Sequence, residues 1–264
     1  MYFSFEHITA AYGKNVVLRD FSMEIPRGNI VTLIGANGCG KSTLLKTVTR
    51  AVTPTSGRIL FDEKPLTAYS PKQLAQKIAC LAQVHNAPPD LDVRTLVACG
   101  RYPYARFGRD ARTSDRAIVE RAIEMTGLQK LSSRQLSTLS GGEVQRAWIA
   151  MAVAQEPEIL ILDEPTTYLD IGYQMEILEL VRRLQDACGM TILMVLHDLN
   201  LAARYSDMLC AMKDGALYAS GTPREVLTAD NLRALFGIRA QILEDAAHDC
   251  PYFVPDVAEK GEIS

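Results

Sequence analysis

The chain has 264 residues, a formal net charge of −3, a hydrophobic fraction of 48% and a charged fraction of 22%. These values are typical of a folded globular protein, and the slightly acidic balance gives no electrostatic reason to expect a nucleic-acid partner. The longest apolar runs fall well short of the roughly 20 residues that span a bilayer, so membrane association is expected only through a partner. The N-terminus has no secretory signal pattern, which predicts a cytoplasmic protein.

An apolar, β-branched run over residues 29–34 predicts a buried strand that ends at a glycine-rich turn. Beyond the turn, the spacing of Leu44, Leu45 and Val48 predicts a helix. The order strand, glycine-rich loop and helix is the usual setting of a phosphate-binding loop.

The loop itself reads GANGCGKST over residues 35–43 and matches the GxxxxGK[ST] pattern. In this pattern the backbone amides surround phosphate oxygens, the lysine adds a positive charge on the outer phosphates and the serine hydroxyl binds magnesium. The sequence therefore predicts a site for ATP and Mg2+. The predicted nucleotide-binding residues of the loop are Gly35, Ala36, Asn37, Gly38, Cys39, Gly40, Lys41, Ser42 and Thr43.

The middle of the chain becomes helix-rich from about residue 88 to residue 156. Ser114 is the predicted N-cap of a helix over DRAIVERAIEM, and Gly127 is the predicted stop. We interpret this region as a helical subdomain inserted into a core of about residues 1–87 and 157–238.

Two further runs, residues 159–162 and 191–196, are continuously apolar and are predicted to be buried strands of a parallel sheet. The first run carries Asp163 and Glu164 out of the core at its carboxyl end, where α/β sheets bind ligands. We expect Asp163 to hold magnesium through water. Glu164 is the predicted general base that polarises the attacking water.

The segment LSGGE, residues 139–143, places two glycines between Ser140 and a predicted helix, which makes a second anion-accepting helix N-terminus. Together with the two preceding motifs it resembles the signature of the ABC transporter ATPases, and the resemblance covers residues 2–236. It implies an α/β P-loop NTPase fold with a mainly parallel core sheet, an antiparallel β edge and an inserted helical subdomain, in a domain over residues 1–238. It also implies a head-to-tail homodimer in which Ser140, Gly141, Gly142 and Glu143 contact the ATP of the partner copy.

Four more positions match the family pattern. Gln83 in CLAQVH resembles the glutamine that reaches magnesium and links the sheet to the helical insert, and His197 in MVLHDLN resembles the histidine that contacts the terminal phosphate. Asp170 in YLD matches the loop that crosses the dimer interface, and Tyr12 in AAYGKNVVL resembles the aromatic residue on which adenine stacks. Glu164, His197 and Lys41 are thus the predicted catalytic set, and Ser42, Gln83 and Asp163 the predicted metal ligands.

The segments PTTYLDIGYQ, LHDLNLAARYSD and GRYPY resemble those of ATPases that serve importers of iron–siderophore complexes, haem or cobalamin. The choice among these cargoes stays open. The resemblance implies an integral-membrane permease that docks near Gln83 and the helical subdomain, and an extracytoplasmic binding protein that acts indirectly. The chain would then lie at the cytoplasmic face of the cell membrane. GRYPY, residues 100–104, is either part of the permease contact or a loop with partly buried tyrosines.

Two other functions compete with transport. A soluble ABC ATPase acting on nucleic acid or ribosomes usually has two cassettes or a long coiled-coil insertion, and this sequence shows neither. A nucleotide-gated binding module without turnover is disfavoured by the intact set Asp163, Glu164 and His197.

Several residues match no motif. The tail, residues 239–264, has scattered apolar positions whose role the sequence does not indicate. Six cysteines lie far apart without a CxxC pair, which favours free thiols over disulfides or zinc. His7, His85 and His248 are expected to be surface or packing residues.

Overall fold

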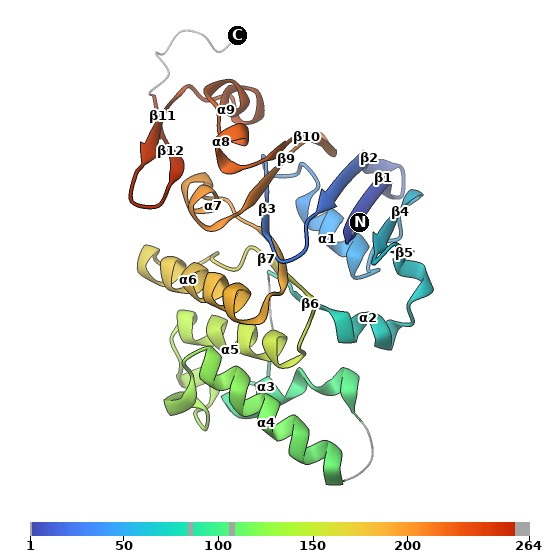
Figure 1. Ribbon diagram of the computed structural model, residues 1–264, viewed down its shortest axis with the longest axis vertical. Coiled ribbons are helices and arrows are strands. Elements are labelled where there is room, and N and C mark those ends of the chain that lie inside the picture. The colour runs from blue at the N-terminus through green and yellow to red at the C-terminus, as the bar shows by residue number, and fades with distance from the viewer. Residues whose placement is uncertain (1, 84–86, 106–108, 257–264) are drawn as a thin grey trace. The chain divides into compact units, whose positions relative to one another are not determined.

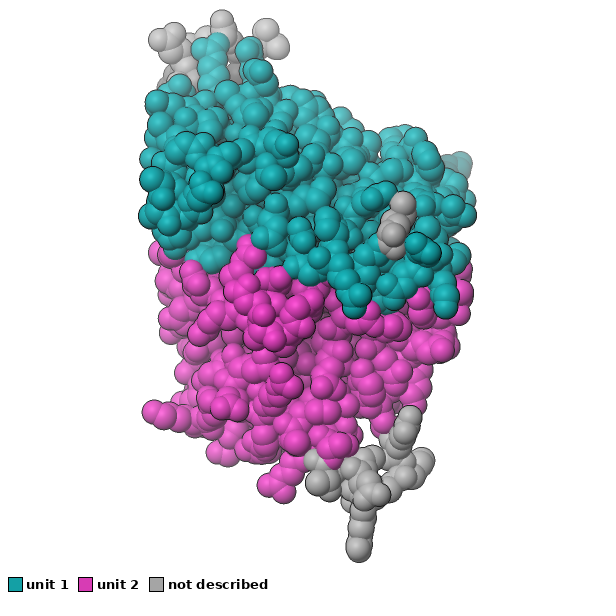
Figure 2. Space-filling view, in the orientation of Figure 1, with its two compact units in different colours: residues 1–66, 193–264 teal, residues 67–192 magenta. Residues whose placement is uncertain are grey.

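The computed structural model describes residues 2–83, 87–105 and 109–256. The chain forms two compact units, coloured separately in Figure 2. Unit 1 contains Met1–Leu66 and Leu193–Ser264, and unit 2 contains Thr67–Ile192. These units do not test the predicted limits of the helical subdomain, which stay a prediction. Of the unmatched histidines, His85 lies outside the described residues.

Unit 1 contains an antiparallel sheet built on an aromatic core. Its strands follow the order β2-β1-β4-β5, with bounds β1 (Phe3–Tyr12), β2 (Asn15–Ile25), β4 (Ser56–Phe61) and β5 (Lys64–Pro65). Phe3, Phe5, Phe21 and Phe61 are fully buried, and the rings of Phe3 and Phe5 pack edge to face with centroids 5.5 Å apart. This sheet confirms the predicted antiparallel β edge.

Parallel strands of unit 1 support the glycine-rich loop (Figure 1). Strand β3 (Ile30–Ile34) is buried along its whole length and pairs in parallel with β9 (Met208–Lys213), which pairs antiparallel with β10 (Ala216–Gly221). Helix α1 (Lys41–Val48) follows the loop. The strand and helix predicted on either side of residues 35–43 are therefore confirmed. Strand β8 (Thr191–Val195), predicted over residues 191–196, divides between the two units.

The C-terminal part of unit 1 has more structure than the sequence indicated. It contains α7 (Leu199–Tyr205), α8 (Pro223–Val226), α9 (Ala229–Phe236), β11 (Ala240–Asp245) and β12 (Cys250–Pro255). Strands β11 and β12 form an antiparallel hairpin. The side chain of Asn200 fastens it, because its Nδ2 donates to the Phe253 carbonyl at 3.3 Å and its Oδ1 accepts from the Phe253 N–H at 2.9 Å. The predicted tail is thus a docked hairpin up to residue 256, and residues 257–264 lie outside the described part.

Unit 2 contains two parallel strands and a group of helices. Strands β6 (Ile78–Leu81) and β7 (Ile159–Asp163) pair with Leu81 opposite Leu162, which confirms the strand predicted over residues 159–162. Helices α3, α4 and α5 lie side by side (Figure 1). The helices are α2 (Pro71–Lys77), α3 (Val93–Cys99), α4 (Arg109–Met125), α5 (Gly141–Ala154) and α6 (Ile171–Cys188), and the short 3-10 turns are η1 (Leu66–Ala68), η2 (Tyr102–Tyr104), η3 (Gln129–Leu131) and η4 (Leu136–Thr138).

Helix α4 corrects one prediction and confirms another. It begins at Arg109, so Ser114 lies inside the helix and is not its N-cap. The preceding residues RDART contain no glycine or proline, and nothing in them stops the helix from extending toward the N-terminus. At the other end Gly127 adopts a left-handed φ of 70° two residues after Met125, as the stop signal predicted.

All six cysteines belong to the described residues and are free thiols, as predicted. Within the described ranges, no helix combines the length and hydropathy required to cross a membrane.

Candidate nucleotide-binding site

The phosphate-binding loop of unit 1 has a backbone that requires glycine at two positions. Gly35 and Gly40 have φ values of 144° and 108°, in the region that side chains disfavour. A methyl group on Gly35 would collide with the Met212 carbonyl, and one on Gly40 would lie 2.9 Å from Cδ2 of Leu18. The loop is therefore held against β2 and β9 as a glycine cradle, which fits a phosphate chain.

Lys41 and the start of α1 add positive potential to this cradle. Lys41 is buried, and its Nζ donates hydrogen bonds to the carbonyls of Gly35 at 2.8 Å and Ala36 at 3.1 Å. The N-cap is Gly40, which has no side chain with which to cap the helix. Ser42 lies in the first turn. The backbone amides and the positive end of the helix dipole thus face the loop, as an anion site requires.

His197 joins the loop at a cavity of about 390 Å3 in unit 1. The cavity is lined by Gly35, Ala36, Asn37, Leu196, His197, Leu199, Leu235 and Phe236. The structure therefore brings together the loop and the histidine that the sequence linked only by resemblance. It also adds Leu235 and Phe236 from the end of α9, which the sequence analysis missed. Their apolar spacing indicates a packed helix and contains no signal for a nucleotide site.

Tyr12 lies at the end of β1, opposite Asn15, and is 48% exposed. It does not belong to the lining of the His197 cavity. An exposed ring at a strand end can stack on a base, and its role stays a prediction.

In unit 2, Gln83 and Glu164 meet at the carboxyl edge of the parallel pair β6–β7. Each lies two residues beyond the paired residues Leu81 and Leu162. Gln83 Nε2 donates to Oε2 of Glu164 at 2.6 Å, and the Thr167 hydroxyl donates to the same oxygen at 3.0 Å. The predicted magnesium-binding glutamine and the predicted base are therefore in direct contact.

Asp163 ends β7 at this same edge and is partly exposed. Burial, followed by the nearby Asp163 carboxylate, raises the pKa of the Cys80 thiol in β6 to about 11. This carboxylate therefore places negative charge at the strand edge, which favours a cation there. Together with the amide oxygen of Gln83, it offers oxygen ligands of the kind that Mg2+ prefers. In the described residues, no group of three or more His, Cys, Asp or Glu side chains is arranged to bind a metal.

The signature residues form the N-terminus of α5 as a capping box. The Ser140 hydroxyl accepts from the Glu143 N–H at 3.3 Å, and Oε2 of Glu143 accepts from the Ser140 N–H at 2.8 Å. The hydrogen bond from the Ser140 N–H lowers the pKa of Glu143. The box leaves the amides of Gly141 and Gly142 as the N–H groups of this helix terminus that can face an anion.

Asp170 caps the next helix, α6, because its Oδ1 accepts from the Tyr173 N–H at 3.0 Å. The neighbouring Tyr168 and Ile171 are 92% and 76% exposed. Both side chains therefore lie on the surface beside the Asp170 cap.

In the GRYPY segment, Arg101 and Tyr104 pack against neighbouring residues, whereas Tyr102 is exposed. Arg101 is buried and donates to Oδ1 of Asp115 at 2.8 Å, to the Ala154 carbonyl at 2.9 Å and to Oε2 of Glu156 at 2.9 Å. The Tyr104 hydroxyl donates to the Gln76 carbonyl at 3.0 Å. Tyr102, in contrast, is 83% exposed.

The remaining described histidines pair with neighbouring carboxylates. His7 Nδ1 lies 2.7 Å from Oδ1 of Asp20, and His248 Nδ1 lies 2.7 Å from Oδ2 of Asp245. Both are surface pairs, as expected for residues outside the motifs.

Comparison with known proteins gives the family. The family model described as ABC transporter matches residues 18–167. The chain is 43% identical over 250 residues to the ferric enterobactin transport ATP-binding protein FepC of Escherichia coli, covering 95% of this chain and 92% of FepC. It is 46% identical over 249 residues to the iron(3+)-hydroxamate import ATP-binding protein FhuC of Bacillus subtilis, covering 94% and 92%.

Solved structures agree with this family. A chain of a transporter described as metal-chelate type, in an inward-facing conformation, superposes with a TM-score of 0.83 at 27% identity, covering 97% of both chains. The cassette MJ0796, solved as a dimer bound to ADP and Pi, superposes with a TM-score of 0.69 at 27% identity, covering 83% of this chain and 98% of that one. The predicted α/β ATPase fold is thereby confirmed.

Proposed function

The chain belongs to the ABC transporter family, and we propose that it is the ATP-hydrolysing subunit that drives uptake of an iron–siderophore-type cargo through a separate permease. The names of the relatives support an importer of ferric siderophores or hydroxamates. The observation that carries the catalytic part is the pairing of Glu164 with Gln83 at the edge of β6 and β7.

The glycine cradle and the N-terminus of α1 are the proposed binding site for the phosphate chain of ATP. Lys41 and His197 are proposed to stabilise the charge on the phosphoryl group as it transfers to water. Glu164 accepts the proton of the attacking water while the oxygen of that water bonds to the terminal phosphorus and ADP leaves. Tyr12 is the proposed stacking partner of adenine.

Ser42, Asp163 and Gln83 are the proposed ligands of Mg2+. When bound, the ion neutralises negative charge on the phosphate oxygens. Gln83 is suited to two tasks, because its Nε2 donates to Glu164 while its Oε1 is the kind of oxygen that magnesium accepts.

We further propose that two copies of the chain act as a head-to-tail dimer. The amides of Gly141 and Gly142 in one copy would bind the nucleotide of the other, next to Ser140 and Glu143. The exposed Tyr168 and Ile171 beside Asp170 support a contact between copies at this loop. The dimeric ADP-bound relative supports the same arrangement.

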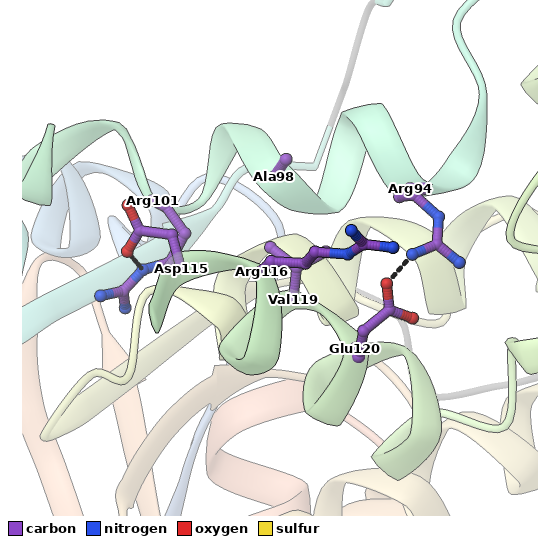
Figure 3. A pocket seen from close by; sticks show the side chains of 7 residues that line it. All are labelled: Arg94, Ala98, Arg101, Asp115, Arg116, Val119 and Glu120. Carbon is purple, nitrogen blue, oxygen red and sulfur yellow. Dashed lines mark hydrogen bonds and ion pairs between the residues drawn. The ribbon is translucent and has the colours of Figure 1, made fainter. Parts of the chain in front are cut away.

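The permease is proposed to dock on the helical region, predicted over about residues 88–156, and near Gln83. Residues of α3 and α4 line an open pocket of about 520 Å3 there, and Figure 3 shows its charged side chains. Arg94 pairs with Glu120 and Arg101 with Asp115, whereas Arg116 makes no ion pair within the described part of the chain. A charged pocket close to the exposed Tyr102 is suited to an amphipathic segment with an acidic residue. The chain would then lie at the cytoplasmic face of the membrane.

The substitution Glu164→Gln tests the catalytic assignment. We expect the purified variant to bind Mg2+-ATP with the affinity of the wild type and to accumulate as a nucleotide-bound dimer, because the amide cannot accept the proton. Phosphate release should fall by about a hundredfold or more, the usual contribution of a general base. Steady-state hydrolysis near the wild-type rate would show that Glu164 is not the base.

The cargo is tested separately, because the cargo passes through the permease. Cells that carry the wild-type chain should take up labelled ferric siderophore in an energy-dependent way, and should not take up labelled haem or cobalamin. Cells that carry the Glu164→Gln chain should lose the siderophore uptake. Transport of haem or cobalamin instead would correct the cargo and keep the ATPase.

A further inference from the structure

The turn that follows β7 folds back onto Glu164. Glu164 has a φ of 54°, which is unusual for a residue with a side chain. The Thr167 N–H donates to the Glu164 carbonyl at 3.3 Å, and the Thr167 hydroxyl donates to Oε2 of Glu164 at 3.0 Å. Thr167 therefore contacts both the backbone and the carboxylate of the same residue.

Two donors meet on one carboxylate oxygen. Oε2 accepts from the Thr167 hydroxyl and, at 2.6 Å, from Nε2 of Gln83. The terminal torsion of a glutamate is broad and poorly restrained by itself. Anchoring one oxygen from two directions restricts this torsion, so the orientation of the carboxylate is set by its donors.

The two donors differ in where they come from. Gln83 follows β6, on a different segment of the chain, and its amide is also the proposed ligand of magnesium. Thr167 lies three residues after Glu164 in the same turn, so its hydroxyl stays beside the carboxylate when Gln83 engages another group.

We propose that Thr167 is a positioning residue for hydrolysis: its hydroxyl holds Oε2 of Glu164 and thereby keeps the base in one orientation toward the attacking water. The inference rests on the proposed function, since it requires Glu164 to be the base. Thr167 itself touches neither nucleotide nor water in this role.

The test compares three variants of the full chain. Thr167→Val keeps the shape and β-branching of the side chain but removes the donor, and Thr167→Ser keeps the donor. Thr166→Val makes the same change at the preceding residue, whose hydroxyl has no hydrogen bond to any described residue. We expect kcat for Thr167→Val to fall about tenfold, the effect of losing one hydrogen bond to a charged group, with the KM for ATP unchanged. Thr167→Ser and Thr166→Val should stay within about twofold of the wild type.

Each other outcome has a separate meaning. Wild-type kcat in Thr167→Val, or an equal loss in Thr167→Ser, would overturn the positioning role. If Thr167→Val does not fold, Thr167→Ala replaces it with the same expectation. In a Glu164→Gln background, Thr167→Val should cause no further loss, because the two residues act as one unit, and a further tenfold loss would also contradict the inference. Normal hydrolysis by Glu164→Gln alone would instead overturn the proposed base.

Discussion

Replacement of Gly142 by alanine should uncouple the signature helix from α6. Gly142 is buried in the first turn of α5, beneath the ring of Tyr173. A methyl group on Gly142 would lie 2.9 Å from Cγ and 3.0 Å from Cε1 of that ring, and closer still to Cδ1. Since carbon atoms pack favourably at about 3.5–4.0 Å, and since Cγ is the root of the ring, the whole side chain would have to move.

The size of the effect follows from this collision. Overpacking of a well-packed site costs about 1–3 kcal/mol, and the gain in helix propensity from glycine to alanine offsets at most about 1 kcal/mol. Taking the middle of the first range, about 2 kcal/mol, the net loss is about 1–2 kcal/mol, which lowers Tm by about 2–8 °C in a chain of this size class. Gly141→Ala is the matched control, because its methyl group would meet only Cδ2 of Leu169, at an ordinary 3.5 Å.

The assay is thermal unfolding of both variants, followed by ATP binding and hydrolysis at a temperature where both are folded. Gly142→Ala should bind ATP through the loop of unit 1 and hydrolyse it slowly. A second substitution, Tyr173→Leu, should recover part of the lost stability, and the double-mutant cycle measures that coupling. The steric reasoning is refuted if Gly142→Ala unfolds at the same temperature as Gly141→Ala, or if Tyr173→Leu adds its own loss without any coupling.

Two further predictions concern other contacts. Asn200→Ala removes both hydrogen bonds to Phe253. The free energy of local opening at β12 should therefore fall by about 1–3 kcal/mol, and the β12 amides should exchange their hydrogens faster. Asn200→Asp keeps the acceptor and should give an intermediate exchange rate, whereas unchanged protection in Asn200→Ala would show that other contacts hold the hairpin. The capping box should depend on pH, because the Ser140 N–H lowers the pKa of Glu143 from its ordinary 4.5. Its contribution is complete above that value and is lost as the pH falls through the lowered pKa. Glu143→Gln keeps the box without the titration, so its urea midpoint should fall less than that of the wild type as the pH is lowered from neutral through the lowered pKa, to about pH 3. Equal falls would contradict this reasoning.

Features set by neighbouring residues were predictable from the sequence. The buried strand β3, the glycine loop and α1 follow from an apolar run, the GxxxxGK[ST] pattern and helical spacing within 20 residues. The meeting of Gln83 and Glu164 was also accessible, because parallel strands end at one edge of a sheet and each residue lies two positions beyond the paired residues Leu81 and Leu162. Their hydrogen bond itself depends on the left-handed turn at Glu164, for which the sequence has no glycine as a signal.

Features set by distant residues were not predictable. The hairpin β11–β12 is fastened by Asn200, 53 residues before its partner Phe253. No pattern within residues 239–264 reports that contact. Leu235 and Phe236 likewise reach the His197 cavity because α9 packs there, and their spacing would be the same on any amphipathic helix.

The GRYPY segment shows why a motif alone does not define a docking surface. A buried guanidinium costs several kcal/mol unless it is paired and hydrogen-bonded. The Nε and Nη1 groups of Arg101 donate to Asp115, Ala154 and Glu156, in α4 and at the end of α5. The Tyr104 ring lies 4.0 Å from that guanidinium. Packing within unit 2 therefore accounts for Arg101 and Tyr104, and neither residue requires a partner protein. Tyr102 is the tyrosine of this segment that packing leaves exposed, so a docking experiment should change Tyr102 and leave Arg101 intact.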